Sequence, residues 1–438
     1  MEEKKSSELS IIVDPERLDE GSPEEQAGFA AIGVHFGNTW LTEGHDGLVN
    51  KVRPAPLLSG YHLAEWTAWN WWRLRWEPRS KAADWDFAHR LATIGEGYVW
   101  PNITIFSDGE RIAILAKPTP ERPNTIFRYL CDAAVVVLAR EFEYVLDRFI
   151  EQVRGLLRER GIVQSNLDKV WNDIVAERQD NQRAKRRKLE ALLGRDPDGA
   201  DAEIVSLLKD VAALGESAIN ELAADHPQGG ALLTAKLLKE TAASKGFDAS
   251  PLDVVRLASN IRLPPVGELP AWRLGAEAAK AVRNQQGLGT GPIKNDVLAK
   301  LAGVQSEALN ANAPGPPISF ALDNGTSSRV VLRSKWQNGR RFDLARLLGD
   351  RVASPTGRFF PATRAHTYRQ KVQRSFAAEL LSPFESVDDM LGGDFSVENR
   401  EDVAEYFQVS EWTIRSLLVN HHRLEREDLE VDFDEAVS

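Results

Sequence analysis

The chain has 438 residues with a formal net charge of −11, and 42% of its residues are hydrophobic and 27% charged. This length predicts roughly two to four globular domains. The single cysteine, Cys131, excludes an intramolecular disulfide and a cysteine-based zinc finger. The charged start lacks the apolar region of a signal peptide, and the chain has no apolar run long enough for a membrane span, so we expect a cytoplasmic protein. The negative charge argues against nucleic-acid binding by the chain as a whole and leaves a local basic patch open.

The first part of the chain predicts an arm followed by a small folded domain. Residues 1–25 are rich in charged residues, serine and proline, which is typical of a mobile arm, and 9–13 predict a first strand. Residues 26–122 predict an α+β domain. Within it, 31–36 predict a strand, and 103–115 predict a hairpin around a glycine-containing turn.

This domain holds eight of the twelve tryptophans. In the helix that should end at Pro78, Trp69, Trp72 and Trp76 follow helical spacing and predict an aromatic face. Trp71 and Trp72 are adjacent and cannot share one helical face, so we expect one of them to be exposed.

Two interpretations of this aromatic helix stay open. Trp71, Trp72, Arg73 and Arg75 are candidates for a surface that stacks bases or binds a peptide. The alternative, which we favour, is a core that uses tryptophan for its bulk. A separate enzyme in this domain would have to use polar residues that no recognised catalytic spacing joins, namely His62, Glu65, Asp84, Asp86 and His89.

Residues 123–261 predict a helical bundle or stalk. A long amphipathic helix comes first, and Ser165 with Asp168 predicts a capping box at the start of the next one. That next helix is the most basic stretch of the chain. Its candidate phosphate-binding residues are Arg183, Arg186 and Arg187. The interleaved acidic residues favour a solvated helix face instead.

Residues 262–270 predict a linker, and 329–350 after it carry the main functional clue. They predict a strand, a basic turn and a helix. The residues that define the helix pattern are Arg341, Phe342, Leu344, Ala345, Leu348 and Gly349. This pattern resembles the active-site helix of the ImmA/IrrE family of zinc metallopeptidases. A second run, from Phe376 to Pro383, is also similar to a helix of that family.

The resemblance implies a zincin-like domain over 270–424 whose catalytic residues are absent. The family's two metal-binding histidines fall on Arg346 and Asp350, and its catalytic glutamate falls on Leu347. Gln370 and Val372 stand at the plausible positions of the third ligand, a glutamate.

The chemistry of these residues predicts a site that neither binds zinc nor hydrolyses peptides. In a zincin, two imidazoles on one helical face hold the metal, and a glutamate acts as general base. The guanidinium of Arg346 cannot ligate Zn²⁺, and Leu347 cannot accept a proton. We therefore expect no cofactor. A relocated metal site would have to use His366, Asp343, Asp350 and Asp388, which have no recognised ligand spacing.

The end of the chain predicts two short helices and an acidic tail. Residues 396–420 have the pattern of a helix-turn-helix with Ser410 as the N-cap of its second helix. Trp412 and Arg415 would then be the residues that reach a DNA groove. Neighbouring carboxylates oppose this function, because they would repel phosphates. Residues 425–438 predict a disordered tail.

The favoured hypothesis is a mostly helical α+β, non-catalytic regulatory protein that holds a protein partner in the former substrate cleft. ImmA/IrrE members cleave helix-turn-helix repressors in response to stress, DNA damage or mobile elements. The resemblance therefore implies transcription regulation, or antiphage defence, for this chain. The alternatives are a nucleic-acid-binding regulator that uses the basic helices or the C-terminal pair, and a metallopeptidase with relocated ligands.

Overall fold

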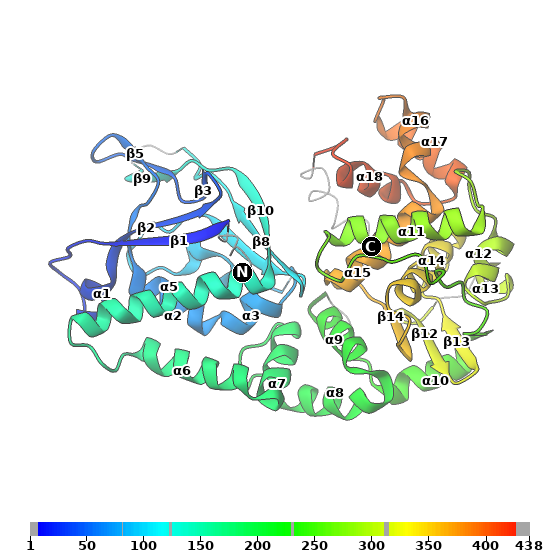
Figure 1. Cartoon of the computed structure of the whole chain (residues 1–438), viewed down its shortest axis with the longest axis horizontal. Coiled ribbons are helices and arrows are strands. Elements are labelled where there is room, and N and C mark those ends of the chain that lie inside the picture. The colour runs from blue at the N-terminus through cyan, green and yellow to red at the C-terminus, as the bar shows by residue number, and fades with distance from the viewer. Residues whose placement is uncertain (1–7, 81, 122–124, 229–231, 311–314, 426–438) are drawn as a thin grey trace. The chain divides into compact units, whose positions relative to one another are not determined.

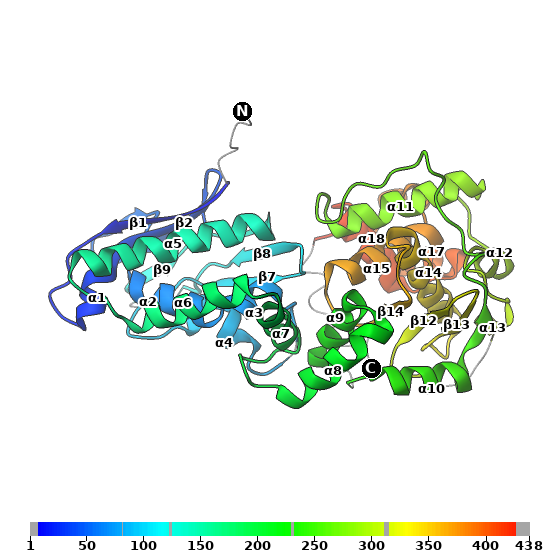
Figure 2. The ribbon, with the colours of Figure 1, turned by 60° about the horizontal axis from the view of Figure 1, so that its bottom comes forward.

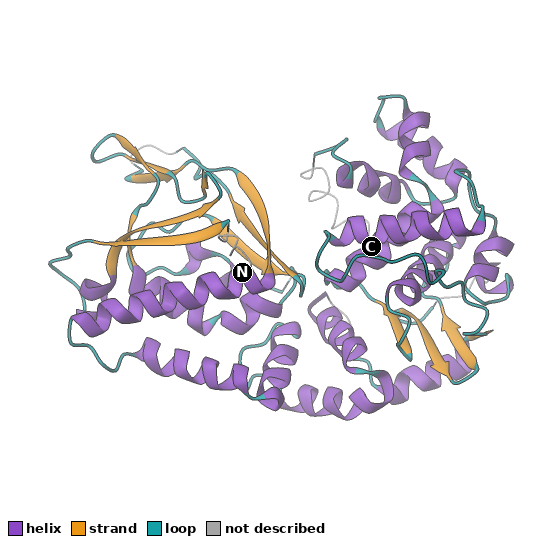
Figure 3. Cartoon of the chain, viewed as in Figure 1, coloured by secondary structure: helices purple, strands orange, loops and turns teal. Residues whose placement is uncertain are grey.

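A computed structural model describes residues 8–80, 82–121, 125–228, 232–310 and 315–425. The described residues combine helices with small antiparallel sheets (Figures 1 and 3), which confirms the mixed α+β class. The chain divides into two compact units, Met1–Ile204 and Val205–Ser438. No helix of the described residues is both long and apolar enough to cross a bilayer.

Three small sheets form the β part of the first unit. One has the order β1-β2-β3 with β6 also paired to β2, the second has the order β10-β8-β7, and the third β5-β4-β9. The strands are β1 (Leu9–Pro15), β2 (Phe29–Phe36), β3 (Thr39–Trp40), β4 (Gly44–Asp46), β5 (Lys51–Arg53), β6 (Leu57–Ser59), β7 (Ile103–Ser107), β8 (Arg111–Ala116), β9 (Phe127–Tyr129) and β10 (Ala133–Leu138).

Part of the expected mobile arm belongs to this fold. Strand β1 pairs with β2 along its whole length, from Leu9 opposite Phe36 to Pro15 opposite Ala30. The burial pattern is that of a strand with one face in the core, because Leu9 and Val13 are buried while the residues between them are more exposed. Residues 1–7 of the expected arm lie outside the described residues.

Helices of the first unit pack against the sheet of β1 and β2 and against the sheet of β7, β8 and β10, and the longest of them, α5, packs against β1 (Figure 2). The apolar stripe of α5, which includes Phe142 and Phe149, is buried in the same core as the tryptophan-rich segment. The helices are α1 (Pro23–Gly28), α2 (Gly60–Trp69), α3 (Trp71–Trp76), α4 (Trp85–His89), the 3₁₀ turn η1 (Leu91–Thr93), α5 (Ala139–Glu159), α6 (Asn166–Gln179) and α7 (Asn181–Leu192).

The structure divides the chain differently from the five segments expected above. Helices α5, α6 and α7, from the segment predicted as a bundle, share the core of the tryptophan-rich domain. The next helix, α8 (Asp201–Leu214), crosses the boundary, and the rest of that segment belongs to the second unit. The reason is packing, because the apolar residues of α5 and α6 are buried in one core with the strands of the first unit.

The predicted capping box at the start of α6 is confirmed. The Ser165 hydroxyl accepts from the Asp168 amide, and the Asp168 carboxylate accepts from the Ser165 amide at 3.1 Å. The basic segment is two helices rather than one. It breaks at Asp180, whose carboxylate accepts from the amides of Gln182 and Arg183 and so caps α7.

The second unit consists of helices around one four-stranded antiparallel sheet of order β11-β13-β12-β14. Its strands are β11 (Phe247–Ala249), β12 (Ser319–Asn324), β13 (Ser327–Val331) and β14 (Phe359–Ala362). Its helices are α9 (Glu216–Asp225), the 3₁₀ turn η2 (His226–Gln228), α10 (Ala235–Lys245), α11 (Ala271–Gln286), α12 (Asn295–Leu301), α13 (Glu307–Asn310), α14 (Gln337–Ala353), α15 (Tyr368–Leu381), α16 (Phe384–Leu391), α17 (Val397–Phe407) and α18 (Glu411–Asn420).

Helix α15 is the centre of the second unit and packs against both α11 and α14 (Figure 1). Two glycines permit these close approaches. A Cβ at Gly349 of α14 would lie 2.6 Å from the ring of Phe376, and one at Gly275 of α11 would lie 2.4 Å from the carbonyl oxygen of Val372. The glycine in the motif thus brings the two motif helices together.

Candidate functional site

The first metal-ligand position of the resemblance, Arg346 on α14, is buried between α14, α15 and the residues after β14. Its Nη2 donates to the carbonyl oxygen of Thr363 at 2.6 Å and to Oε1 of Gln370 at 2.6 Å. Gln370 is one of the two positions proposed for the third ligand. The structure therefore brings two positions that the resemblance assigns to metal ligands into direct contact.

The second ligand position, Asp350, is 1% exposed and lies one turn further along α14. Both of its carboxylate oxygens accept from Arg369 of α15, at 2.7 Å from Nε and 2.6 Å from Nη2. Such a bidentate pair uses the planar guanidinium in full. The Asp350 carboxylate is thereby committed to an ion pair.

The two remaining motif positions lie away from this contact. Leu347 is buried in the main apolar core of the unit, where its isobutyl group packs instead of serving as a base. Val372 lies in a separate apolar cluster with Ala271, Leu274 and Tyr368. Of the two alternatives for the third ligand, Gln370 is therefore the one that faces α14.

Five arginines converge on this place, and we call them the arginine cluster: Arg333, Arg346, Arg364, Arg369 and Arg374. Nη2 of Arg374 donates to three backbone carbonyls, those of Thr363, Arg364 and Ala365. Burial, together with the charge of Arg346, lowers the pKa of Arg374 to about 9. Burial also lowers the pKa of Arg346. The guanidinium of Arg346 is thus buried beside that of Arg374, while Arg333 and Arg364 are partly exposed.

Zinc does not fit these residues. A zincin site needs imidazole and carboxylate donors that converge on one point, whereas Arg346 brings a guanidinium to Gln370 and Arg369 engages Asp350. The expected alternative site also fails to form in the described chain, where His366, Asp343, Asp350 and Asp388 do not cluster at ligand distances. The one acidic group at such distances there, Glu190, Asp198 and Asp201, belongs to the first unit and is paired with Arg186 and Arg187.

Two of the carboxylates that face the arginine cluster come from helix α9, which no sequence motif connected with the site. Oε2 of Glu221 accepts from the Thr367 hydroxyl at 2.6 Å, and Oδ1 of Asp225 accepts from the Arg364 amide at 2.7 Å. Figures 1 and 2 both show α9 beside α15 and β14. Only the buried polar positions on α9, four residues apart, could have indicated this from sequence.

The tryptophan candidates in the first unit are buried, which corrects the expectation that Trp71 or Trp72 is exposed. They are 4% and 6% exposed and pack edge to face, with ring centroids 4.8 Å apart. The helix breaks at Asn70, so Trp69, which is 58% exposed, does not continue the face of Trp72. Nε1 of Trp72 donates to Glu177 at 2.9 Å, and Arg178 lies over the Trp71 ring. Helix α6 therefore covers the pair.

The arginine candidates of the first unit are paired with carboxylates. Arg73 is buried against Glu77, Arg75 pairs with Glu143, and Arg187 contacts Glu177, Glu190 and Asp198. Arg186 pairs with Asp201, and Arg183 is exposed near Asp180. Among these, Arg183 is the most available to a phosphate.

One polar residue from the set considered for an enzyme, His89, belongs to a buried network. His89 places Nδ1 2.7 Å from the Ile105 carbonyl oxygen and Nε2 3.0 Å from Glu77, which also accepts from Arg73 at 2.6 Å. The Trp85 ring stacks on the imidazole at 4.2 Å. Both ring nitrogens lie within hydrogen-bond distance of acceptors, so the imidazole is held in place by this buried network.

The C-terminal residues form two consecutive helices, α17 and α18. The Ser410 hydroxyl accepts from the Thr413 amide and caps α18, as predicted. Arg400 of α17 donates to Glu411 of α18 at 2.6 Å and ties the helices together. Trp412 and Arg415 are partly buried, with the guanidinium 5.7 Å from the ring centroid. Residues 426–438 of the predicted acidic tail lie outside the described residues.

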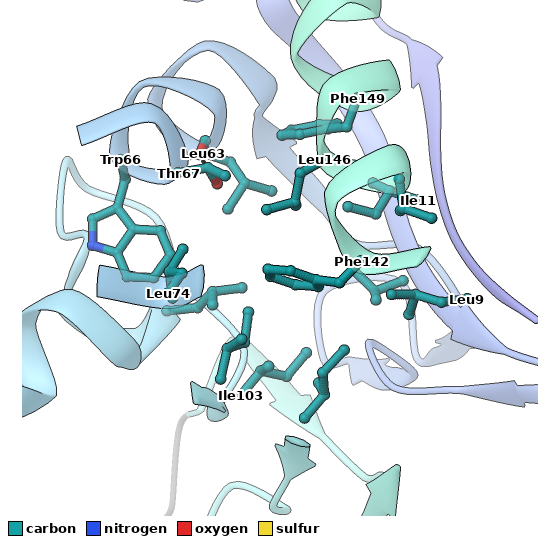
Figure 4. Close-up of a pocket in the computed structure, with 15 residues that line it drawn as sticks. Leu9, Ile11, Leu63, Trp66, Thr67, Leu74, Ile103, Phe142, Leu146 and Phe149 are labelled. Carbon is teal, nitrogen blue, oxygen red and sulfur yellow. Dashed lines mark hydrogen bonds between the residues drawn. The ribbon is translucent and has the colours of Figure 1, made fainter. Parts of the chain in front are cut away.

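The first unit also contains an apolar cavity between α5 and its surroundings (Figure 4). Its volume is about 40 Å³, and its lining includes Leu63, Trp66, Phe142, Val145 and Leu146. No titratable side chain lines it, so it offers no chemistry of its own.

The site with the most chemistry is thus the arginine cluster between α9, α14 and α15. Its ion pairs and hydrogen bonds join Arg346 and Asp350 of α14 to Gln370 and Arg369 of α15. This arrangement gathers positive charge at the two positions that the resemblance assigns to metal ligands on α14. Comparison with protein-family models, with curated proteins and with solved structures finds no match for this chain.

Proposed function

We propose that the second unit is a peptidase-like domain without catalysis, which binds a protein partner and regulates it. The observation that carries this proposal is the contact of Arg346 with Gln370 at 2.6 Å. A guanidinium stands where the resemblance implies a metal ligand, and it contacts the residue where the resemblance implies the third ligand. In this proposal, the guanidinium of Arg346 supplies positive charge that the zinc ion supplies in the ImmA/IrrE enzymes.

The hydrolytic alternative is disfavoured by the same residues. Peptide hydrolysis at a zincin site requires an activated water and a base. Leu347 has no proton acceptor, and the Asp350 carboxylate is held by Arg369. The nucleic-acid alternative has less support, because Trp71 and Trp72 are buried and most candidate arginines are paired within their unit.

The partner class follows from the resemblance and from charge. The partly exposed Arg333 and Arg364 place positive charge at the edge of the cluster, and positive charge attracts acidic segments. By analogy with the ImmA/IrrE family, we infer a role in the control of a repressor, of a mobile element or of antiphage defence, in the cytoplasm.

Metal analysis of the full chain, purified without chelators, is the direct test. We expect far less than one zinc per chain and no hydrolysis of peptides that ImmA/IrrE enzymes cleave. Stoichiometric zinc together with peptidase activity would overturn the proposal.

A reconstruction variant sharpens this test. Combined Arg346→His, Leu347→Glu, Asp350→His and Gln370→Glu substitutions restore the residue types that the resemblance assigns. We expect this variant to bind one zinc, because α14 and α15 already bring positions 346 and 370 together. If the folded variant binds no zinc, the proposed relation to a zincin site is wrong.

A further inference from the structure

Helix α9 and the arginine cluster are complementary in charge. Glu221 and Asp225 lie one helical turn apart, both are buried, and both face the cluster. Glu221 interacts with Arg369, and Asp225 interacts with Arg364, Arg346 and Arg333. Five guanidinium groups thus face four carboxylates, with Asp343 and Asp350 as the other two, and α9 supplies half of the negative charge.

The cluster can bind further negative charge. Within the described residues, the guanidinium groups of Arg333 and Arg364 make no hydrogen bond, although both lie near Asp225. Nε of Arg346 is buried and has no hydrogen-bond partner there. Buried polar groups are normally paired, so the free Nε of Arg346 and the partly exposed Arg333 and Arg364 show that α9 satisfies the cluster only in part.

The start of α9 is weakly fixed, as expected for a helix that can leave its contact. The chain turns between α8 and α9 at Gly215, whose φ is 90°, and this N-cap glycine has no side chain to cap the first turn. Burial raises the pKa of Glu221 and of Asp225 despite the arginines around them. Desolvation of the two carboxylates therefore outweighs the attraction, which limits the net stability of the contact.

We propose that α9 is an internal ligand that occupies the partner-binding surface of the arginine cluster. The partner is then a helix that presents two carboxylates one turn apart and displaces α9 by making the same contacts. This inference rests on the proposed function and specifies its binding site and the chemistry of its partner.

A labelled peptide tests the surface without knowledge of the partner. The probe is a fluorescein-labelled peptide of residues 216–228, and binding to the full chain is followed by anisotropy. The Glu221→Lys chain places a lysine against the arginines and expels its own α9 by repulsion. The Glu216→Lys chain carries the same charge change at an exposed position of the same helix.

We expect the Glu221→Lys chain to bind the peptide at least tenfold more tightly than the Glu216→Lys chain, in which α9 still competes. The binding should weaken with salt, because salt screens the attraction that offsets part of the desolvation of the two carboxylates. A peptide with both Glu221→Lys and Asp225→Lys should not bind. Equal binding of the two peptides, or no binding by a folded Glu221→Lys chain, overturns the inference.

Hydrogen exchange of the unchanged chain gives a second test that does not depend on a variant. A displaceable α9 must open without unfolding α14 and α15, so its amides should exchange at least tenfold faster than those of α15. Equal protection of α9 and α15 would show that α9 is part of the core. That result would refute the inference and leave the zinc measurement, and thus the proposed function, untouched.

Discussion

Replacement of Asp350 by asparagine isolates the ion pair at the second former ligand position. The change keeps the size of the side chain and removes its charge. Arg369 is bound to Asp350 at 2.7 and 2.6 Å and is itself largely buried. Without the carboxylate, a buried guanidinium loses its strongest partner.

The size of the expected loss of stability follows from the burial of Asp350 and Arg369. Removal of one partner of a buried ion pair typically costs about 3–5 kcal/mol, because the other charge stays desolvated. Arg369 keeps its hydrogen bond to the Ser217 hydroxyl at 3.1 Å and the nearby charge of Glu221, which compensate in part. We therefore expect a loss of about 3 kcal/mol in the free energy of unfolding of the second unit.

Hydrogen exchange of the α15 amides is the suitable assay, because it reports on this unit alone. A loss of about 3 kcal/mol corresponds to exchange roughly a hundredfold faster for amides that open globally. Asp389→Asn is the matched control, since Asp389 is exposed on α16. If Asp350→Asn changes the exchange by no more than the control does, the ion pair contributes little and our account of the site is wrong.

Three further predictions concern the site, the cavity and pH. Arg346→Met should change the free energy of unfolding by less than about 1 kcal/mol. Gln370 Oε1 still accepts from the Thr363 amide at 2.9 Å, and the repulsion between Arg346 and Arg374 disappears. A loss above about 3 kcal/mol in urea unfolding would contradict this prediction. Val145→Ile should stabilise the first unit by up to about 1 kcal/mol, since the cavity that Val145 lines measures about 40 Å³; a lower urea midpoint would show that the void cannot accept a methyl group. The contact of α9 should weaken as pH rises. Burial raises the pKa of Glu221 and Asp225 above their ordinary values of 4.5 and 3.8, so the stability they contribute is complete below those values and is lost as pH rises through the folded pKa. The charges of Arg369 and Asp350 act on Glu221, and those of Arg364, Arg346 and Arg333 act on Asp225. These charges determine the pH at which each carboxylate is half ionised in the folded protein. Exchange of the α9 amides, corrected for intrinsic rates, should therefore accelerate from pH 5 to 8 relative to α15, and a constant ratio would refute the prediction.

Local sequence determined the elements whose signals are local. The capping residues Ser165 and Ser410, the hairpin of β7 and β8, and the start of α15 at the Thr367 cap follow from interactions within a few residues. The prediction that position 346 does not ligate zinc likewise rests on residue type, since no fold can turn the side chain of an arginine into a zinc ligand.

Tertiary structure decided which side chains meet and which are buried. Trp71 and Trp72 are both buried because α6, about a hundred residues later, covers them, and a helical wheel of one segment cannot contain that contact. Arg346 meets Gln370 only because Gly349 lets α14 approach α15. The carboxylates of α9 reach the arginine cluster from more than a hundred residues away, and no local pattern encodes such a long-range contact.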